Sequence, residues 1–162
     1  MAIDSTHDPR VVMTLDAGGT NMVFSAMQGD KPAVKPITLP SQADNLEACL
    51  GVIVQGFTEV KKQLQPAPVA ISFAFPGPAD YPAGIIGDLG NLPAFRGGVA
   101  LGPMLQDKFK IPVFINNDGD LFVYGEAIAG FLPHVNAQLK KAGSPKQYQN
   151  LFGITLGTGF GG

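Results

Sequence analysis

The sequence predicts an α/β protein built on a mixed five-stranded sheet with helices on both faces. Alternating apolar residues at 11–27 and 69–75 are typical of strands, whereas apolar residues spaced by three and four between Leu46 and Leu64 are typical of an amphipathic helix. Turns that contain glycine or proline separate these segments. We therefore expect an antiparallel meander of three strands that is extended by two parallel strands.

The meander occupies the N-terminal part of the chain. Strands at 11–17 and 22–27 flank the sequence Gly-Gly-Thr at 18–20, which is short enough to form a hairpin turn. A third strand is expected at 33–39. Because prolines occur in it and beside it, we place this strand at the edge of the sheet, where a missing N–H donor is tolerated.

A helix is expected from Asp44, which can form a capping box with Glu47. Cys49 lies on the apolar stripe of this helix and is interpreted as a core thiol rather than a catalytic one. The other residues of the stripe share a spacing of three or four, and they are Leu46, Leu50, Ile53, Phe57, Val60 and Leu64.

The strand predicted at 69–75 has large side chains on one face and small side chains on the other, so we expect a helix to pack close to the small face. Residues 76–98 are irregular and rich in glycine and proline, and such a long irregular segment in a compact domain is often functional. Asn91 is the polar side chain of interest there, on a backbone stiffened by Pro93. The small face of the strand predicted at 69–75 consists of Ala70, Ser72 and Ala74.

A short helix at 103–109 and a strand at 113–115 are predicted next, followed by Asn117, Asp118 and a second helix. Asp118 has two interpretations. It can simply be the N-cap of that helix, a role that stabilises by about 1 kcal/mol. It can also be a functional carboxylate at the carboxyl end of a strand, which is where open α/β sheets bind their ligands.

Two turns that contain glycine and threonine each follow a predicted strand, the second of them a strand at 151–156. Glycine lets a phosphate approach the backbone closely, and the N–H and hydroxyl groups of two such turns can hold a polyphosphate from both sides. Asp16 can hold a hydrated divalent cation beside it. Each turn alone is equally compatible with an ordinary glycine turn, but the pair together with Asn117 and Asp118 favours a phosphate site. The turn residues are Gly18, Gly19, Thr20, Gly157, Thr158 and Gly159.

Composition limits the classes of partner. The net charge is −2, and no run of Lys or Arg is present, so the segment offers no electrostatic surface for nucleic acid or an anionic membrane. A single cysteine excludes an internal disulfide, and the absence of CxxC or HxxxH spacing makes structural zinc within this segment unexpected. With no apolar leader and no run of transmembrane length, we expect a cytoplasmic protein.

The motifs resemble those of the ROK family of sugar kinases and repressors, in the actin-like ATPase (ribonuclease H-like) superfamily. The sequence from Asp16 to Asn21 is similar to the first phosphate motif of that family, and the sequence from Leu156 to Gly162 is similar to the second. Asn91-Leu-Pro is similar to the loop that contacts the sugar, and Asn117-Asp118 to the catalytic pair. The order of the motifs matches the family from Val11 onward, although the block at 133–150 is longer than the resemblance leads us to expect.

The resemblance implies a glucokinase-like enzyme that uses ATP and Mg²⁺ to phosphorylate a hexose hydroxyl, with glucose or a close relative as the substrate. Asp118 would accept the proton of the attacking hydroxyl, and Asn91, Asn117 and Asp118 would hold the sugar. The six turn residues would bind the phosphates, and Asp16 would position Mg²⁺ through water. Two alternatives are a sugar-responsive transcriptional regulator of the same family, which the short segment before the first strand disfavours, and a catalytically silent sugar-binding module.

The resemblance also implies a division into domains. We expect a flexible N-terminus at 1–10, an actin-like ATPase domain at 11–132, an inserted helical excursion at 133–150, and the first strand and phosphate turn of a truncated second domain at 151–162. The remainder of that second domain would supply a zinc cluster, the adenine pocket and further sugar contacts. The 162 residues alone are therefore expected not to turn over ATP, and the full-length parent is expected to form a homo-oligomer.

Overall fold

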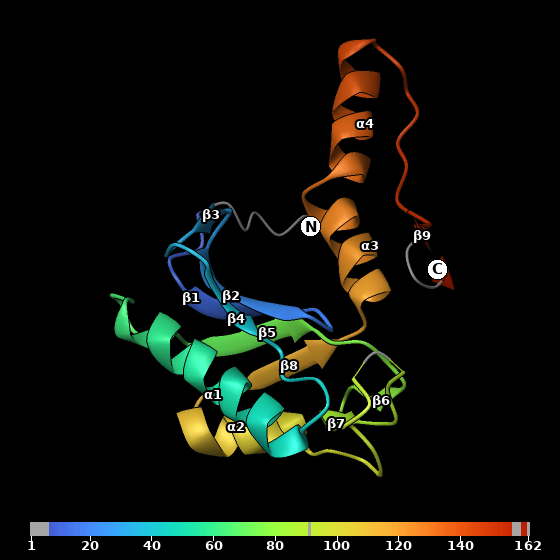
Figure 1. Cartoon of the computed structure of the whole chain (residues 1–162). Coiled ribbons are helices and arrows are strands. Elements are labelled where there is room, and N and C mark those ends of the chain that lie inside the picture. Colours follow the sequence, from blue (N-terminus) through green and yellow to red (C-terminus); the bar gives the residue numbers. More distant parts are fainter. Residues whose placement is uncertain (1–6, 91, 157–159, 162) are drawn as a thin grey trace. The chain divides into compact units, whose positions relative to one another are not determined.

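The computed structural model describes residues 7–90, 92–156, 160 and 161, and the chain divides into two compact units. The first unit ends at Asn116 and contains the main sheet, and the second begins at Asn117 and contains the last two helices (Figure 1). The helices of the described residues are α1 (Leu46–Lys62), α2 (Leu101–Phe109), α3 (Asp118–Ile128) and α4 (Phe131–Lys141).

The main sheet is mixed, as the sequence predicts, but it contains six described strands rather than the predicted five. Its strand order is β3-β2-β1-β5-β8, and β4 pairs with β2 beside this path. The β1 and β2 strands are antiparallel, whereas β5 is parallel to both β1 and β8. The strands of this sheet are β1 (Val11–Ala17), β2 (Asn21–Gln28), β3 (Lys31–Pro32), β4 (Ile37–Pro40), β5 (Ala70–Ala74) and β8 (Val113–Asn116).

The predicted third strand of the meander is divided into β3 and β4, so the prediction of one strand at 33–39 is wrong. The β3 strand pairs with Met27 and Gln28, whereas β4 pairs with the other end of β2. Pro36 has no N–H group and restricts the backbone of the residue before it, which interrupts the ladder. The predicted edge position is confirmed because both strands pair only with β2 among the described strands.

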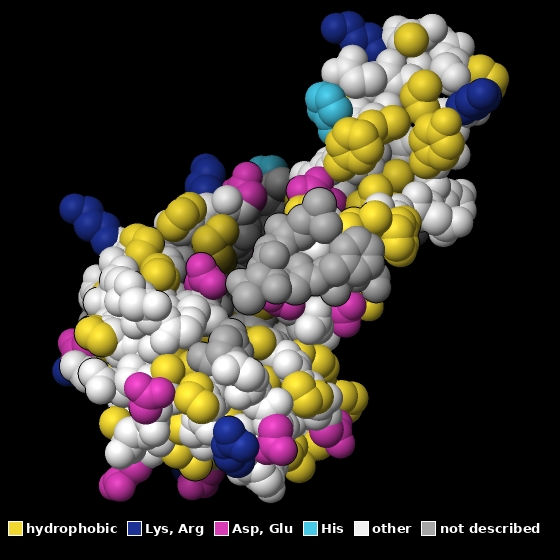
Figure 2. All heavy atoms as spheres, turned by 45° about the vertical axis from the view of Figure 1, so that its right-hand side comes forward, with side chains coloured by type: hydrophobic (Ala, Val, Ile, Leu, Met, Phe, Trp, Pro, Cys, Tyr) yellow, Lys and Arg dark blue, Asp and Glu magenta, His cyan; other side chains and the backbone are white. Residues whose placement is uncertain are grey.

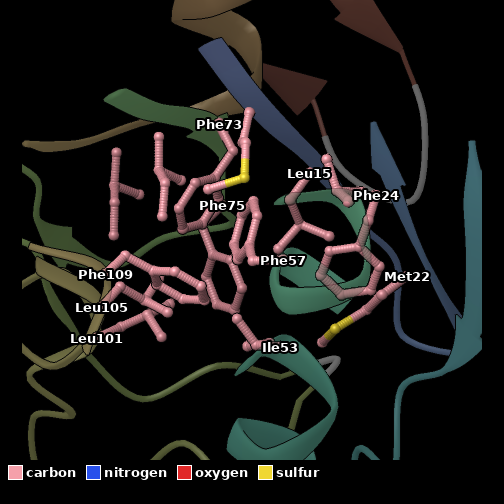
Figure 3. Packing of buried hydrophobic residues seen from close by; sticks show 14 of the residues in the cluster. Leu15, Met22, Phe24, Ile53, Phe57, Phe73, Phe75, Leu101, Leu105 and Phe109 are labelled. Carbon is pink, nitrogen blue, oxygen red and sulfur yellow. The ribbon is translucent and has the colours of Figure 1, made fainter. Parts of the chain in front are cut away.

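Both helices of the first unit pack on one face of the sheet through Phe57 of α1. Its ring centroid lies 5.4 Å from that of Phe24 on β2, 5.8 Å from that of Phe73 on β5 and 6.0 Å from that of Phe109 on α2. Figure 3 shows these rings together in the core. The large side chains of β5 therefore face the helices, since burying them removes the most apolar surface from water.

The expected helix against the small face of β5 is not found among the described residues of this unit. The expectation was based on the small size of Ala70, Ser72 and Ala74. In the first unit, α1 and α2 instead lie together on the face that buries Ile71 and Phe73 (Figure 1). Small side chains permit a close approach by a helix, but they provide little apolar area to hold one.

Helix α1 begins later than predicted, and its N-cap is Asn45. The Asn45 Oδ1 atom accepts a hydrogen bond of 2.9 Å from the Ala48 N–H group. The residue at the third helical position is therefore Ala48, so the predicted capping box of Asp44 with Glu47 is wrong. The predicted apolar stripe does face the core at Ile53, and Cys49 is fully buried, which raises the pKa of its thiol.

Two further elements of the first unit were predicted only in part. Helix α2 begins at Leu101 rather than at Pro103, and its predicted end at Phe109 is correct. The irregular segment at 76–98 contains a small antiparallel hairpin formed by β6 (Ala79–Asp80) and β7 (Ile85–Ile86).

The second unit differs from the prediction in the lengths of its elements. Helix α4 begins at Phe131, before the expected start of the helical excursion at 133–150. Of the strand predicted at 151–156, only β9 (Thr155–Leu156) is present, and it pairs with β10 (Phe160–Gly161). Among the described residues, no helix is both long enough and apolar enough to cross a membrane.

No side chain of α3 or α4 is buried. Large apolar side chains of these helices are exposed, and Figure 2 shows hydrophobic side chains gathered over this unit. The segment after α4 is hydrogen-bonded to that helix: the Asn136 side chain donates to the Tyr148 carbonyl and accepts from the Tyr148 N–H group. The exposed large apolar side chains of α3 and α4 are those of Phe122, Tyr124, Ile128 and Phe131.

The packing of α1 on β2 leads to a first prediction. A Cβ atom on Gly56 would lie 2.4 Å from the ring of Phe24, so Gly56→Ala forces the helix away from the sheet. Overpacking of this kind typically costs about 1–3 kcal/mol. We expect urea unfolding of the chain, followed by circular dichroism, to show a loss of stability in that range.

The matched control is Gly51→Ala in the same helix. Nothing lies within 4 Å of a Cβ atom at Gly51, so the gain in helix propensity should raise stability by up to about 1 kcal/mol. If Gly56→Ala were as stable as Gly51→Ala, the close contact between α1 and β2 would be incorrect.

Candidate functional site

The first glycine turn joins β1 to β2. The Gly18 N–H group donates a hydrogen bond of 3.0 Å to the Asn21 carbonyl oxygen, which closes the turn. A Cβ atom at Gly18 would lie only 2.7 Å from that same oxygen. Glycine is therefore required at position 18 by the geometry of the turn itself.

Ser41 stabilises this turn through two hydrogen bonds. Its N–H group donates to the Thr20 carbonyl at 3.0 Å, and its Oγ atom donates to the Gly19 carbonyl at 2.5 Å. Ser41 is 2% exposed, and among the described residues it is the one polar residue that is buried. Sequence reasoning missed Ser41 because it lies directly after a short edge strand, and its pairing with the turn spans 22 positions.

Asp16 lies at the carboxyl end of β1 with an exposed side chain. It is aligned with Ala74 of β5, which in turn is aligned with Asn116 of β8. Asp16 and Asn116 are thus separated by two strand spacings, each of about 4.8 Å, on the same edge of the sheet. This is the edge at which the parallel strands end, where α/β proteins place their ligands.

Asp16 can be one ligand of a cation whose remaining ligands are mainly groups other than protein carboxylates. No cluster of three or more His, Cys, Asp or Glu side chains is found in the part of the chain that the structure describes. A single carboxylate, completed by water and phosphate oxygens, is the way Mg²⁺ commonly binds beside nucleotides. The donor set at the turn therefore fits Mg²⁺ held with a phosphate ligand.

In the second unit, Asn117 is the N-cap of α3. Its Oδ1 atom accepts a hydrogen bond of 2.8 Å from the Gly119 N–H group. Asp118 is the first residue of the helix, and its exposed carboxylate also accepts from Gly119 at 2.9 Å. The interpretation of Asp118 as the N-cap is therefore wrong, since the preceding residue takes that role.

The strand that leads to the second glycine turn lies beside the start of α3. A Cβ atom at Gly119 would be 3.7 Å from Thr155 Oγ1, and one at Gly153 would be 2.5 Å from a methyl group of Val123. Residues 153–155 thus pack along α3, close to its N-terminus. This contact brings β9 near Asn117 and Asp118 within the second unit.

The structure divides the predicted site residues between the two units. The first unit brings Asp16 together with the turn at 18–20, and the second brings Asn117 and Asp118 together with Thr155. The other predicted residues lie outside the described residues, and they are Asn91, Gly157, Thr158 and Gly159.

The fold and the polar strand ends define the class of protein as a mixed α/β domain with a glycine turn at the carboxyl edge of its parallel strands. The sequence profile of the ROK family matches residues 12–162. Because this match covers nearly the whole chain, the chain belongs to the ROK family, and its fold is that of the actin-like ATPase sugar kinases.

Among solved structures, the chain is similar to the glucokinase of Parabacteroides distasonis. The two share 65% sequence identity with a TM-score of 0.89, and the match covers 98% of this chain. It covers 45% of the glucokinase, so the chain spans less than half of the length of that relative.

More distant structures share the fold alone. The glucokinase of Streptomyces griseus, solved with glucose and AMPPNP, is 15% identical with a TM-score of 0.63, and the match covers 74% of this chain and 37% of that one. A ROK family transcriptional regulator, a homologue of the E. coli MLC protein, is 16% identical with a TM-score of 0.65, over 76% of this chain and 31% of that one. A comparison with curated proteins finds no match.

The cap assignment leads to a second prediction. Asn117→Ala removes the capping oxygen, one of the two acceptors of the Gly119 N–H group, and should destabilise α3 by up to about 1 kcal/mol. Hydrogen exchange of the amides in the first turn of α3 measures this change. Asn117→Asp retains a capping oxygen and is the control. Equal protection in the Ala and Asp variants would show that Asn117 is not the cap.

Proposed function

We propose that this chain is the N-terminal part of a hexose kinase that transfers a phosphoryl group from ATP to a hydroxyl of glucose or a close relative. The observation that carries the proposal is the 65% identity to the P. distasonis glucokinase over nearly the whole chain. The activity requires a C-terminal part as well, so the chain alone is expected to be inactive.

The phosphates of ATP would bind at the glycine turns. Gly18, Gly19 and Thr20 would supply N–H and hydroxyl donors, and the sequence Gly157-Thr158-Gly159 would supply further donors. Mg²⁺ held by Asp16 through water would neutralise phosphate charge when it is bound. Phosphoryl transfer depends mainly on such positioning and charge neutralisation rather than on covalent chemistry by the protein.

Asp118 would accept the proton of the attacking hydroxyl. Two features support this role: its carboxylate is exposed, and the capping of α3 is assigned to Asn117. A carboxylate in the first turn of a helix is also stabilised by the helix dipole. Asn117 and Asn91 would hold other sugar hydroxyls, and the capping bond of Asn117 would restrict the orientation of its side chain.

A transcriptional regulator of the same family is the second candidate. The likeness to such a regulator is at 16% identity, which supports a shared fold and does not favour the regulatory function over the kinase. A silent sugar-binding module would tolerate the loss of either carboxylate. The presence of both Asp16 and Asp118 supports the kinase instead, since carboxylates at these positions suit metal binding and proton transfer.

The third prediction concerns Asp118 in the complete kinase, in which this chain is followed by a C-terminal part such as that of the P. distasonis glucokinase. Asp118→Asn should lower kcat by about 10²- to 10⁴-fold, because an amide cannot accept the hydroxyl proton. The KM for the sugar should change much less, since the amide still forms hydrogen bonds. Stability should change by less than about 1 kcal/mol.

The control is Asp120→Asn, which removes another exposed carboxylate from the same helical turn and should leave kcat close to that of the unsubstituted protein. Coupled measurement of sugar-dependent ADP release gives both constants. Near-normal kcat in Asp118→Asn would mean that another group accepts the proton. No sugar-dependent ADP release from the unsubstituted complete protein would overturn the kinase proposal itself.

A further inference from the structure

The Ser41 side chain is buried and committed to the first glycine turn. Its backbone N–H group donates a hydrogen bond to the Thr20 carbonyl, and its hydroxyl donates one to the Gly19 carbonyl. Both of its donors are therefore bonded to consecutive carbonyl groups of that turn. Burial of a serine at 2% exposure is costly unless its polar atoms are hydrogen-bonded. This arrangement therefore makes Ser41 part of the turn rather than part of the general core.

The two hydrogen bonds determine which way the turn directs its N–H groups. In a planar trans peptide the C=O and N–H bonds point in opposite directions. When Ser41 holds the Gly19 carbonyl toward the buried side, the N–H group of the same peptide, which belongs to Thr20, must point away from Ser41. That N–H group has no hydrogen-bond partner within the described part of the chain.

Without Ser41, this peptide would be easy to rotate. Gly18 and Gly19 lack a Cβ atom, so the backbone on that side of the Gly19–Thr20 peptide has wide conformational freedom. A rotated peptide would present its carbonyl oxygen where the N–H group had been, and an oxygen there would repel a phosphate. An anion-binding turn depends on N–H groups that share one direction.

Ser41 is itself fixed by three neighbouring elements. The residue before it, Pro40, is aligned with Asn21 in the β4–β2 ladder. The backbone after it turns sharply at Gln42, which has a φ of 53°, and Asn45 at the start of α1 donates to the Gln42 carbonyl at 3.1 Å. The carbonyl at position 43 accepts from the N–H group at position 94, in the loop that follows position 91.

We propose that Ser41 is a positioning residue for the phosphate groups of the nucleotide: it holds the Gly19–Thr20 peptide so that the Thr20 N–H group faces the bound phosphate. The inference rests on the proposed kinase function for the identity of the ligand. The orientation of the peptide rests on the structure alone, so the two can fail separately.

The test uses three variants of the complete kinase. Ser41→Ala removes the hydroxyl and frees the Gly19 carbonyl, Ser41→Thr keeps a hydroxyl, and Ser25→Ala is the matched control. Ser25 is a half-buried serine of β2 whose side chain has no hydrogen-bond partner among the described residues. We expect Ser41→Ala to raise the KM for ATP about 10-fold, the typical effect of losing one hydrogen bond, with a smaller change in the KM for the sugar.

A second readout does not depend on activity. In the 162-residue chain, loss of the Ser41 hydroxyl should shift the NMR resonances of the Gly19 and Thr20 amides and speed their hydrogen exchange. The midpoint of thermal unfolding is measured for each variant, because a residue with a merely structural role would lower it without separating the two KM values. Ser41→Thr should restore the KM for ATP and the amide signals.

The outcomes separate the inference from the function. An active kinase in which Ser41→Ala changes the KM for ATP no more than Ser25→Ala does would overturn the role of Ser41. Unchanged Gly19 and Thr20 amides in the Ser41→Ala chain would overturn it as well, whatever the activity. Altered amides in a complete protein that lacks kinase activity would support the orientation of the turn and refute the identity of the ligand.

Discussion

The contact of α1 with the sheet is the constraint on which the first unit depends. Gly56 lets the helix lie directly against the ring of Phe24, and Phe57, one residue on, contacts aromatic rings from two strands and from α2. These contacts set the height and direction of α1 on the sheet. Because α1 begins at Leu46, one short turn after Ser41, the same packing sets the position of the segment that holds the glycine turn.

The polar residues of the candidate site lie where the fold ends its strands. Asp16 and Asn116 are aligned through Ala74 on one edge of the sheet, and Asn117 and Asp118 follow directly in the chain. Strand ends suit such residues because the backbone leaves the ladder there and its side chains reach solvent. The placement of Asp16 and Asn116 therefore depends on the register of three parallel strands, which the buried face of the sheet holds in place.

The division of roles between neighbouring residues recurs in this chain. Asn45 caps α1 beside Asp44, and Asn117 caps α3 beside Asp118. In each pair the asparagine satisfies an N–H group at the start of the helix, and the adjacent carboxylate is exposed. At α3 this matters for the proposed function, since a carboxylate that is not the cap can be replaced by an amide with little expected effect on folding.

The sequence by itself determined the mixed sheet, the hairpin around the glycine turn and the apolar stripe of α1, because these depend on local periodicity and on turn residues that act over a few positions. Local pattern could not decide between Asp44 and Asn45 as the cap, since both are good capping residues and only the helix geometry selects one. Tertiary structure alone decided that α1 and α2 share one face and that Ser41 holds the turn. Both depend on contacts between residues far apart in sequence, such as the one that spans 22 positions from Gly19 to Ser41, and no local pattern records them.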